Sequence, residues 1–471
     1  MNETLSRTNM HTLTALDQAA LIARGEVSSE QLTRAYLDRI AAFDGAIGAF
    51  VHLRPDAAIA TARRLDRARA RNPSALRGPL WGIPTAMKDL HFTRGFFARM
   101  GTRAYRYVWS PLDDVTSATL RAAGMVIVGK VSTSELAIMP IVESDVHGPT
   151  RNPWDLTRYA GGSSGGTAAA LSAGMLPIAS GSDGAGSIRL PAAFCGLVGL
   201  KTTRGLVPNP HSRFETVGIS VIGPLARSAD DAAALLDVLT GRVAHSTSFL
   251  ASVRTNPKPL RMRFTTRSPV ATVEPEVSRA VDRVVAALGA LGHAIDEGPA
   301  LDGTVEQFLP MFQFLAANTP VPFERLLQPT TRWLRETGRD VPFGQARAAR
   351  TEFERMVGHW FQGVDAWVTP TVAFAAPLVG RWLGRPGRET IFDAAPLGAF
   401  TAAINASGHP AVSIPVWLDG HPRPMGVQIV GRHGRDGELL ALARSVMTAL
   451  GTPIAPLAPA PSARAAGVPT G

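Results

Sequence analysis

The chain has 471 residues, of which 45% are hydrophobic and 18% charged, a balance typical of a soluble protein with a large buried core. Its net charge of +10 comes from scattered arginines rather than from a basic run, which argues against nucleic-acid binding. The chain has no apolar run near the roughly 20 residues that span a bilayer, no secretory signal and a single cysteine, so we expect a cytoplasmic protein without disulfides or a membrane segment.

The first 70 residues have a helical pattern. Apolar residues recur at helical spacing over 11–25, 27–40 and 56–70, and Ser28 with Gln31 forms a capping box. From residue 77 onward the chain changes to short β-like runs, with buried strands predicted at 125–131, 197–203 and 412–416. Helical patterns at 164–175 and 229–241 separate them. This alternation predicts an α/β fold, a large mixed β-sheet core covered by helices on both faces.

The second half of the chain is less regular. Residues 277–292 form an amphipathic helical pattern, and residues 300–350 carry many aromatic side chains in a weaker one. That aromatic region is either a small helical subdomain packed on the sheet or a cap that lines an apolar pocket. The predicted organisation is an N-terminal helical segment (1–70), a core with the candidate catalytic residues (71–230), a half with the cap-like region (231–400), C-terminal strands and a helix (401–455), and a disordered Pro/Ala-rich tail (456–471).

Three segments combine features that packing alone does not require. The segment GIPTAMKDL places Lys88 in an apolar run, and GGSSGG, residues 161–166, stands directly before a helical pattern. In GSDGAGSIRLP, Ser187 follows three small residues whose backbone N–H groups can point into one concavity, as an oxyanion hole requires. The simpler interpretation of this last segment is a tight turn with an incidental serine.

A serine nucleophile needs a base, and two are available. Residues 162–166 fit the pattern G-x-S-x-G, which would make Ser164 the nucleophile of an α/β-hydrolase-type esterase with Asp365 and His409. Alternatively Lys88 is the base, because burial of a lysine favours its neutral form. The competing interpretation of Lys88 is a surface lysine at the end of a strand.

Together the three segments resemble the amidase signature family of serine hydrolases. GPLWGIPTAMKD is similar to its lysine segment, GGSSGGTAAALSAG to its Gly/Ser-rich core, and GSDGAGSIRLPAAFCGLVGLKTTRG to its nucleophile segment. The similarity extends over about 11–450, because ASGHPAVSIPVWLDGHPRPMGVQIVGR also resembles the C-terminal strands of the family. No single segment is as specific as the combination.

The resemblance implies a role for each residue. Ser187 would be the nucleophile, Lys88 the base, and Ser163, which lies 24 residues before Ser187, the intermediate serine that follows a cis peptide bond. The oxyanion hole would use the backbone N–H groups of Gly184, Ala185, Gly186 and Ser187, with Ser164, Asp183 and Arg189 as supporting residues. The family's chemistry involves neither a metal nor another cofactor.

The resemblance also implies a range of substrates. The family includes amidases of linear amides, aryl acylamidases, nylon-oligomer hydrolases and urethane (carbamate) hydrolases, and the aromatic region favours an apolar or aryl-bearing small molecule, with aryl esters also plausible. The alternatives are the glutaminase component of a tRNA-dependent amidotransferase and a catalytically silent scaffold protein. We expect a monomer or a homodimer. The chain departs from the family pattern at Gly184-Ala185, at Tyr159-Ala160 and at Leu90-His91.

Overall fold

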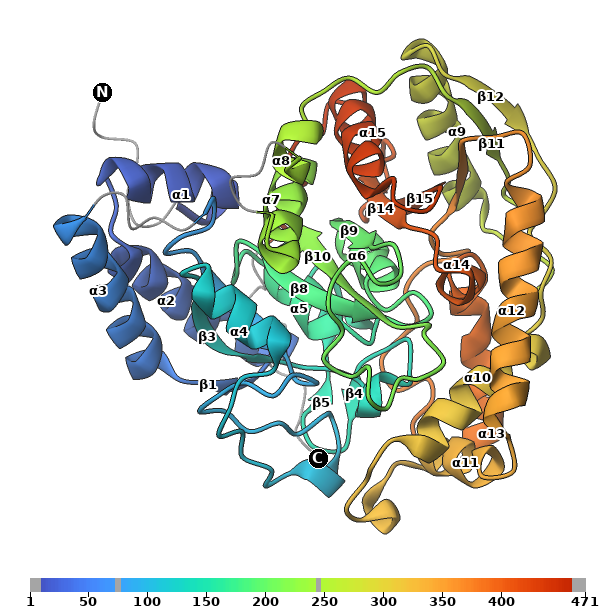
Figure 1. Ribbon diagram of the computed structural model, residues 1–471, viewed down its shortest axis with the longest axis horizontal. Coiled ribbons are helices and arrows are strands. Elements are labelled where there is room, and N and C mark those ends of the chain that lie inside the picture. The colour runs from blue at the N-terminus through green and yellow to red at the C-terminus, as the bar shows by residue number, and fades with distance from the viewer. Residues whose placement is uncertain (1–9, 73–77, 243–246, 460–471) are drawn as a thin grey trace.

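The computed structural model describes residues 10–72, 78–242 and 247–459. Its centre is an eight-stranded mixed sheet (Figure 1). In spatial order the strands are β12 (Ala294–Glu297), β11 (Arg261–Phe264), β13 (Ala366–Pro370), β15 (Met425–Gly431), β14 (Ala411–Val416), β9 (Val198–Lys201), β10 (Val221–Ala226) and β8 (Ala179–Asp183). Strand β11 pairs in parallel with β12 and β13, and the remaining pairs are antiparallel.

Helices cover both faces of this sheet, as the sequence predicts. On one face Val412 and Ile414 belong to a core with the helices α7 (Ala229–Thr240), α9 (Pro275–Ala290) and α15 (Asp436–Ala449). Because side chains alternate along a strand, Ser413 and Gly426 point to the opposite face. That face is covered by α5 (Gly165–Ser172) and α6 (Arg189–Cys195).

A separate three-stranded sheet carries Lys88. Its order is β1 (Phe50–Leu53), β3 (Val126–Val131) and β2 (Pro84–Lys88), and β2 pairs in parallel with β3. The neighbouring helices are α1 (Ala15–Arg24), α2 (Ser29–Ile47), α3 (Pro55–Arg71) and α4 (Val115–Ala122). The predicted capping box of Ser28 and Gln31 is present at the start of α2. Strand β2 also packs against β8, and hydrogen bonds from Thr85 to Ile178 and from Lys88 to Ser182 join the two sheets along this contact.

The aromatic region forms helices that pack on one another. The helices α10 (Val305–Asn318), α11 (Pro329–Gly338) and α12 (Phe343–Trp360) follow β12, and α12 packs against α14 (Ala402–Ser407) (Figure 1). The remaining elements are the strands β4 (Glu143–Ser144), β5 (Gly148–Pro149), β6 (Arg151–Asn152) and β7 (Asp155–Tyr159), the helices α8 (Phe249–Ser252) and α13 (Gly387–Ala394), and short 3₁₀ turns. No helix among the described residues is long and apolar enough to cross a membrane.

The prediction of a disordered tail from residue 456 is wrong at its start. The Ala458 side chain is buried, and its N–H donates to the carbonyl of Ser172 over 2.8 Å. The first residues of the segment therefore lie on the core next to the C-terminal end of α5, because their small and apolar side chains can be buried there. Residues 460–471 lie outside the described part of the chain.

Two glycine substitutions should change stability in opposite directions. A Cβ atom at Gly426 would lie 2.2 Å from the Cβ of Ala193 in α6, so Gly426→Ala should lower the free energy of unfolding by roughly 1–3 kcal/mol. A Cβ atom at Gly358, in the exposed part of α12, has no atom within 4 Å, so Gly358→Ala should raise it by about 0.5–1 kcal/mol. Urea denaturation midpoints measure both, and an unchanged midpoint for Gly426→Ala would contradict the close packing of β15 on α6.

Candidate active site

An apolar pocket opens beside the loop between β8 and α6. Ala185 and Ser187 line it from this loop, and Phe308, Phe312 and Phe353 line it from α10 and α12. Apart from Ser187, Asp302 and Thr304, every lining residue is apolar or glycine. The pocket encloses about 140 Å³, close to the ~150 Å³ of an engineered apolar cavity that binds benzene. The aromatic region is therefore both a packed set of helices and the wall of a pocket that has room for a ring-sized group.

Lys88 lies at the end of β2 and is fully buried. The interpretation as a surface lysine is therefore wrong. Its Nζ donates to the hydroxyl oxygens of Ser163 over 2.7 Å, Ser182 over 2.8 Å and Ser164 over 3.0 Å. Burial lowers the pKa of Lys88 to about 7, although the charge of Asp183 opposes this shift. A lysine with this pKa is partly neutral at physiological pH and can accept a proton.

The GGSSGG segment is buried and packs tightly. Ser163 and Ser164 are both fully buried, and the peptide bond between Gly162 and Ser163 is cis, as the family resemblance implies. A Cβ atom at Gly162 would lie 2.6 Å from the backbone of Ile141, and one at Gly166 would lie 2.4 Å from the backbone nitrogen of Ser132. The glycines therefore let two neighbouring segments pack closely against the backbone on either side of the serines.

The alternative prediction that Ser164 is the nucleophile, on a G-x-S-x-G elbow, is wrong. The Ser164 hydroxyl contacts Lys88 and Ser182, not a histidine. His409 instead hydrogen-bonds Ser407 and stacks on Phe361, and the Asp365 carboxylate accepts the backbone N–H of Arg261. The match to G-x-S-x-G arose because a run of glycine and serine satisfies that pattern easily.

The candidate nucleophile stands on a loop organised by a buried ion pair. Asp183 and Arg189 are both fully buried, and their side chains make two hydrogen bonds of 3.0 Å. Burial alone would raise the pKa of Asp183, but the Arg189 guanidinium outweighs it and lowers this pKa to about 2. Ser187, in contrast, is half-buried and faces the pocket, and its carbonyl accepts the N–H of Ser164 over 3.2 Å. This bond joins the loop of residues 184–188, named the nucleophile loop after the predicted role of Ser187, to the GGSSGG segment.

One member of the predicted oxyanion hole needs correction. The N–H of Gly186 donates to Oδ1 of Asp183 over 2.6 Å, so it is already used within the loop. The N–H groups of Gly184, Ala185 and Ser187 donate to no acceptor in the described part of the chain. Three of the four predicted donors thus remain free for a ligand oxygen.

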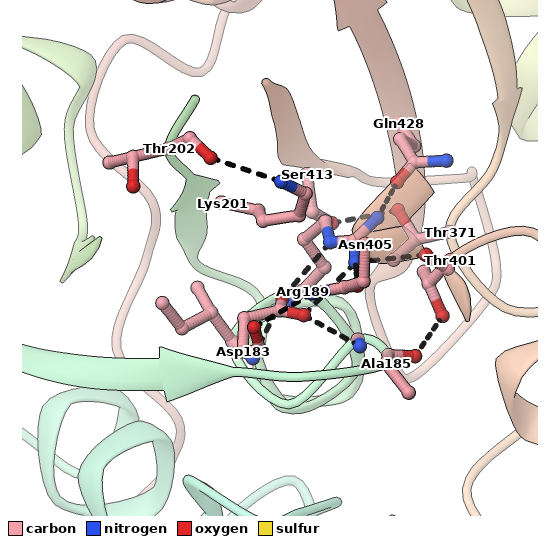
Figure 2. Close-up of polar contacts among 12 residues, drawn as sticks. Asp183, Ala185, Arg189, Lys201, Thr202, Thr371, Thr401, Asn405, Ser413 and Gln428 are labelled. Atoms are coloured by element: carbon pink, nitrogen blue, oxygen red, sulfur yellow. Dashed lines mark hydrogen bonds and ion pairs between the residues drawn. The ribbon is translucent and has the colours of Figure 1, made fainter. Parts of the chain in front are cut away.

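Several polar residues around the ion pair were not predicted from the sequence. Arg189 also donates to Oε1 of Gln428 over 2.7 Å and to the Thr401 carbonyl over 3.1 Å, and Asn405 donates to the Asp183 carbonyl over 2.7 Å (Figure 2). They come from β15, from α14 and from the residue before α14, more than 200 positions along the chain from Arg189, so no local spacing connects them to the loop.

A second buried lysine lies beside this network. Burial lowers the pKa of Lys201 to about 7, with the nearby Arg189 lowering it further. Its Nζ donates to the carbonyl of Thr202 over 3.0 Å (Figure 2). In the described part of the chain it makes no hydrogen bond to the serines that surround Lys88.

Similarity to known proteins identifies the family of this chain. The amidase family model matches residues 31–440. The chain belongs to the amidase family. It is 32% identical over 480 residues to the 6-aminohexanoate-cyclic-dimer hydrolase of Paenarthrobacter ureafaciens, covering 93% of this chain and 94% of that protein. It is also 32% identical to a component of the glutamyl-tRNA(Gln) amidotransferase of Symbiobacterium thermophilum, covering 90% of this chain and 94% of that protein.

The fold agrees with this assignment. A solved structure of 6-aminohexanoate cyclic dimer hydrolase with its substrate superposes with a TM-score of 0.83 at 29% identity, covering 94% of this chain and 98% of that chain. The amidase is therefore an amidohydrolase with the amidase signature fold, as the three sequence segments predict.

Proposed function

We propose that this amidase is a serine hydrolase in which Ser187 attacks the carbonyl, Ser163 relays protons and Lys88 is the terminal base. The observation that carries the proposal is the buried Lys88 amine, which hydrogen-bonds Ser163 over 2.7 Å and has a pKa near neutrality. The bond from the Ser164 N–H to the Ser187 carbonyl supports the relay, because it joins the residue next to Ser163 to Ser187. Catalytic hydrogen bonds often tighten only when substrate is bound.

The reaction proceeds through an acyl-enzyme. Neutral Lys88 takes a proton from Ser163 as Ser163 takes one from Ser187, and the Ser187 oxygen bonds to the substrate carbonyl carbon. The backbone N–H groups of Gly184, Ala185 and Ser187 donate to the resulting oxyanion, and fixed donors of this kind stabilise the charge that develops in the transition state. The relay then returns the proton to the leaving nitrogen, the carbon–nitrogen bond breaks, and water hydrolyses the ester on Ser187 by the same path.

The pocket favours an uncharged substrate with an apolar, ring-sized group. Its wall is formed largely by aliphatic and phenyl side chains, and Asp302 is the one charged residue that lines it. A buried charge needs a partner, so free glutamine, which carries both an ammonium and a carboxylate, fits this lining poorly. This argues against the glutaminase alternative. Carbamates and aryl esters present the same carbonyl to Ser187 and fit equally well.

Substitution of the three proposed residues should separate their roles. Ser187→Ala and Lys88→Ala should reduce kcat/KM for an aryl amide by roughly 10⁴-fold or more, and Ser163→Ala by several orders of magnitude, because residues that act as a unit are each indispensable. A fluorophosphonate probe should label the wild type at Ser187. Absence of labelling would indicate the silent scaffold. Full activity of Lys88→Ala together with an inactive His409→Ala would overturn the proposal.

The activity should depend on pH through the base. Lys88 must be neutral to accept a proton, so kcat/KM for a substrate without ionisable groups should be low in acid, rise about tenfold per pH unit and level off above a midpoint near pH 7. Lys201 has a similar pKa, so Lys201→Met is the matched control. That variant should keep the midpoint of the pH–rate profile. Loss of this midpoint in Lys201→Met would assign the titration to Lys201.

The substrate class can be tested by filling the pocket. Ala402 lines the pocket, so Ala402→Leu should reduce kcat/KM for an N-aryl benzamide by about 10-fold or more and leave acetamide nearly unchanged. Rates for an aryl carbamate and an aryl ester of the same size, measured in parallel, show which carbonyl is preferred. Faster turnover of free glutamine than of any aryl substrate would favour the amidotransferase component instead.

A further inference from the structure

The peptide group between Ala185 and Gly186 is held at both of its ends. Its carbonyl oxygen accepts a hydrogen bond of 2.7 Å from the hydroxyl of Thr401, and its N–H donates to Oδ1 of Asp183 over 2.6 Å (Figure 2). The carbonyl and the N–H of a trans peptide point in opposite directions. The Thr401 hydroxyl and the Asp183 carboxylate therefore fix this peptide group from its two sides.

The orientation of this peptide group matters for the three free N–H groups. They lie on either side of it, at Gly184, Ala185 and Ser187, and a reversed Ala185 carbonyl would place an acceptor among the donors. Gly186 has a φ of +125°, a region in which glycine moves freely and other residues are strained. Without the Thr401 hydroxyl, the bond from the Gly186 N–H to Asp183 would be left to oppose such a reversal, because the backbone at Gly186 itself offers little resistance.

The segment that contains Thr401 makes several hydrogen bonds to the nucleophile loop and to Arg189. Thr401 precedes α14, and its own carbonyl accepts from Arg189 over 3.1 Å. Asn405, in the first turn of α14, donates to the carbonyl of Asp183 over 2.7 Å, so the N–H of the next residue, Gly184, points away from α14. Thr401 and Asn405 thus orient two peptide groups of the nucleophile loop.

Helix capping does not account for the Thr401 hydroxyl. Thr401 occupies the N-cap position of α14, but its side chain makes no capping bond. Its other acceptor, the Gly398 carbonyl, is 3.4 Å away, longer than the 2.7 Å bond to Ala185. The side chain is fully buried and lies where a Cβ atom at Gly186 would come within 2.4 Å of its oxygen.

We propose that Thr401 is a positioning residue for the oxyanion hole, whose hydroxyl keeps the Ala185 carbonyl turned away from the substrate oxygen. The proposal rests on the proposed function, because it requires that Ser187 is the nucleophile and that the neighbouring N–H groups bind the developing oxyanion. Thr401 does not touch the reacting atoms. It acts through the backbone of Ala185 and Gly186.

The test compares Thr401→Val, which has the same shape but no hydroxyl, with Thr401→Ser, which keeps the hydroxyl. Thr401→Val should lower kcat for an aryl amide by about 10- to 100-fold with little change in KM, since the lost orientation matters mainly when charge develops on the oxygen. Thr401→Ser should stay within about threefold of the wild type. The rate of fluorophosphonate labelling at Ser187 should fall in Thr401→Val alone, while the midpoint of the pH–rate profile stays unchanged.

Three results would overturn the proposal: a kcat for Thr401→Val within twofold of the wild type, equal loss of activity in Thr401→Val and Thr401→Ser, or a rise in KM without a fall in kcat. Thr401→Ala removes the same hydroxyl without adding an apolar methyl and replaces Thr401→Val should the latter fail to fold. Ser187→Ala, assayed alongside, separates the two proposals. If Ser187→Ala remains active the proposed function fails, whereas an inactive Ser187→Ala with a fully active Thr401→Val contradicts the role of Thr401 alone.

Discussion

The nucleophile loop depends on the buried ion pair between Asp183 and Arg189. Removing one partner of such a pair leaves an uncompensated buried charge and typically costs about 3–5 kcal/mol. The pair also organises its surroundings, because the carboxylate accepts the N–H groups of Gly186 and Ile188 while the guanidinium reaches Gln428 and Asn405. Gln428 lies 239 positions beyond Arg189 in the chain. The C-terminal strands and α14 are thereby fastened to the start of α6, where Ser187 stands.

The three fully buried lysines differ in their hydrogen-bond partners and not in their burial. Lys130 donates to the Asp89 carboxylate over 2.9 Å and to the carbonyl of His91 over 2.7 Å. Asp89 directly follows Lys88, and its carboxylate is directed to Lys130. Lys88 is left with serine hydroxyls in place of a carboxylate, which is why burial can depress its pKa. Lys201 has a similar pKa, but among the described residues its Nζ hydrogen-bonds a backbone carbonyl and no serine hydroxyl from which it could accept a proton.

The sequence predicts the parts of the structure that depend on local patterns. The capping box of α2, the strand at 126–131 and the helix after GGSSGG follow from residue types at short spacing. The use of the Gly186 N–H by Asp183 could not be predicted, because it depends on how the loop folds back on a carboxylate three residues earlier. Thr401 and Asn405 were missed for a different reason. They lie at the start of and within a short helix of mostly small residues that carries no recognisable motif, and only the tertiary fold brings them to the loop.

The residues at which the chain departs from the family pattern are of two kinds. Some are buried and support the fold, and one lines the pocket. Tyr159 is fully buried, stacks on Trp382 and accepts the N–H of Gly380, so it supports the fold. His91 hydrogen-bonds Asp114 over 2.8 Å within the lysine-bearing region and is also fully buried. Ala185 alone among these residues lines the pocket. Because its N–H is free and the peptide group that follows it is fixed by Thr401 and Asp183, its methyl group changes the shape of the pocket while the backbone donors stay in place. The methyl group of Ala185 can thus affect the shape of the pocket independently of its backbone N–H, the proposed oxyanion donor.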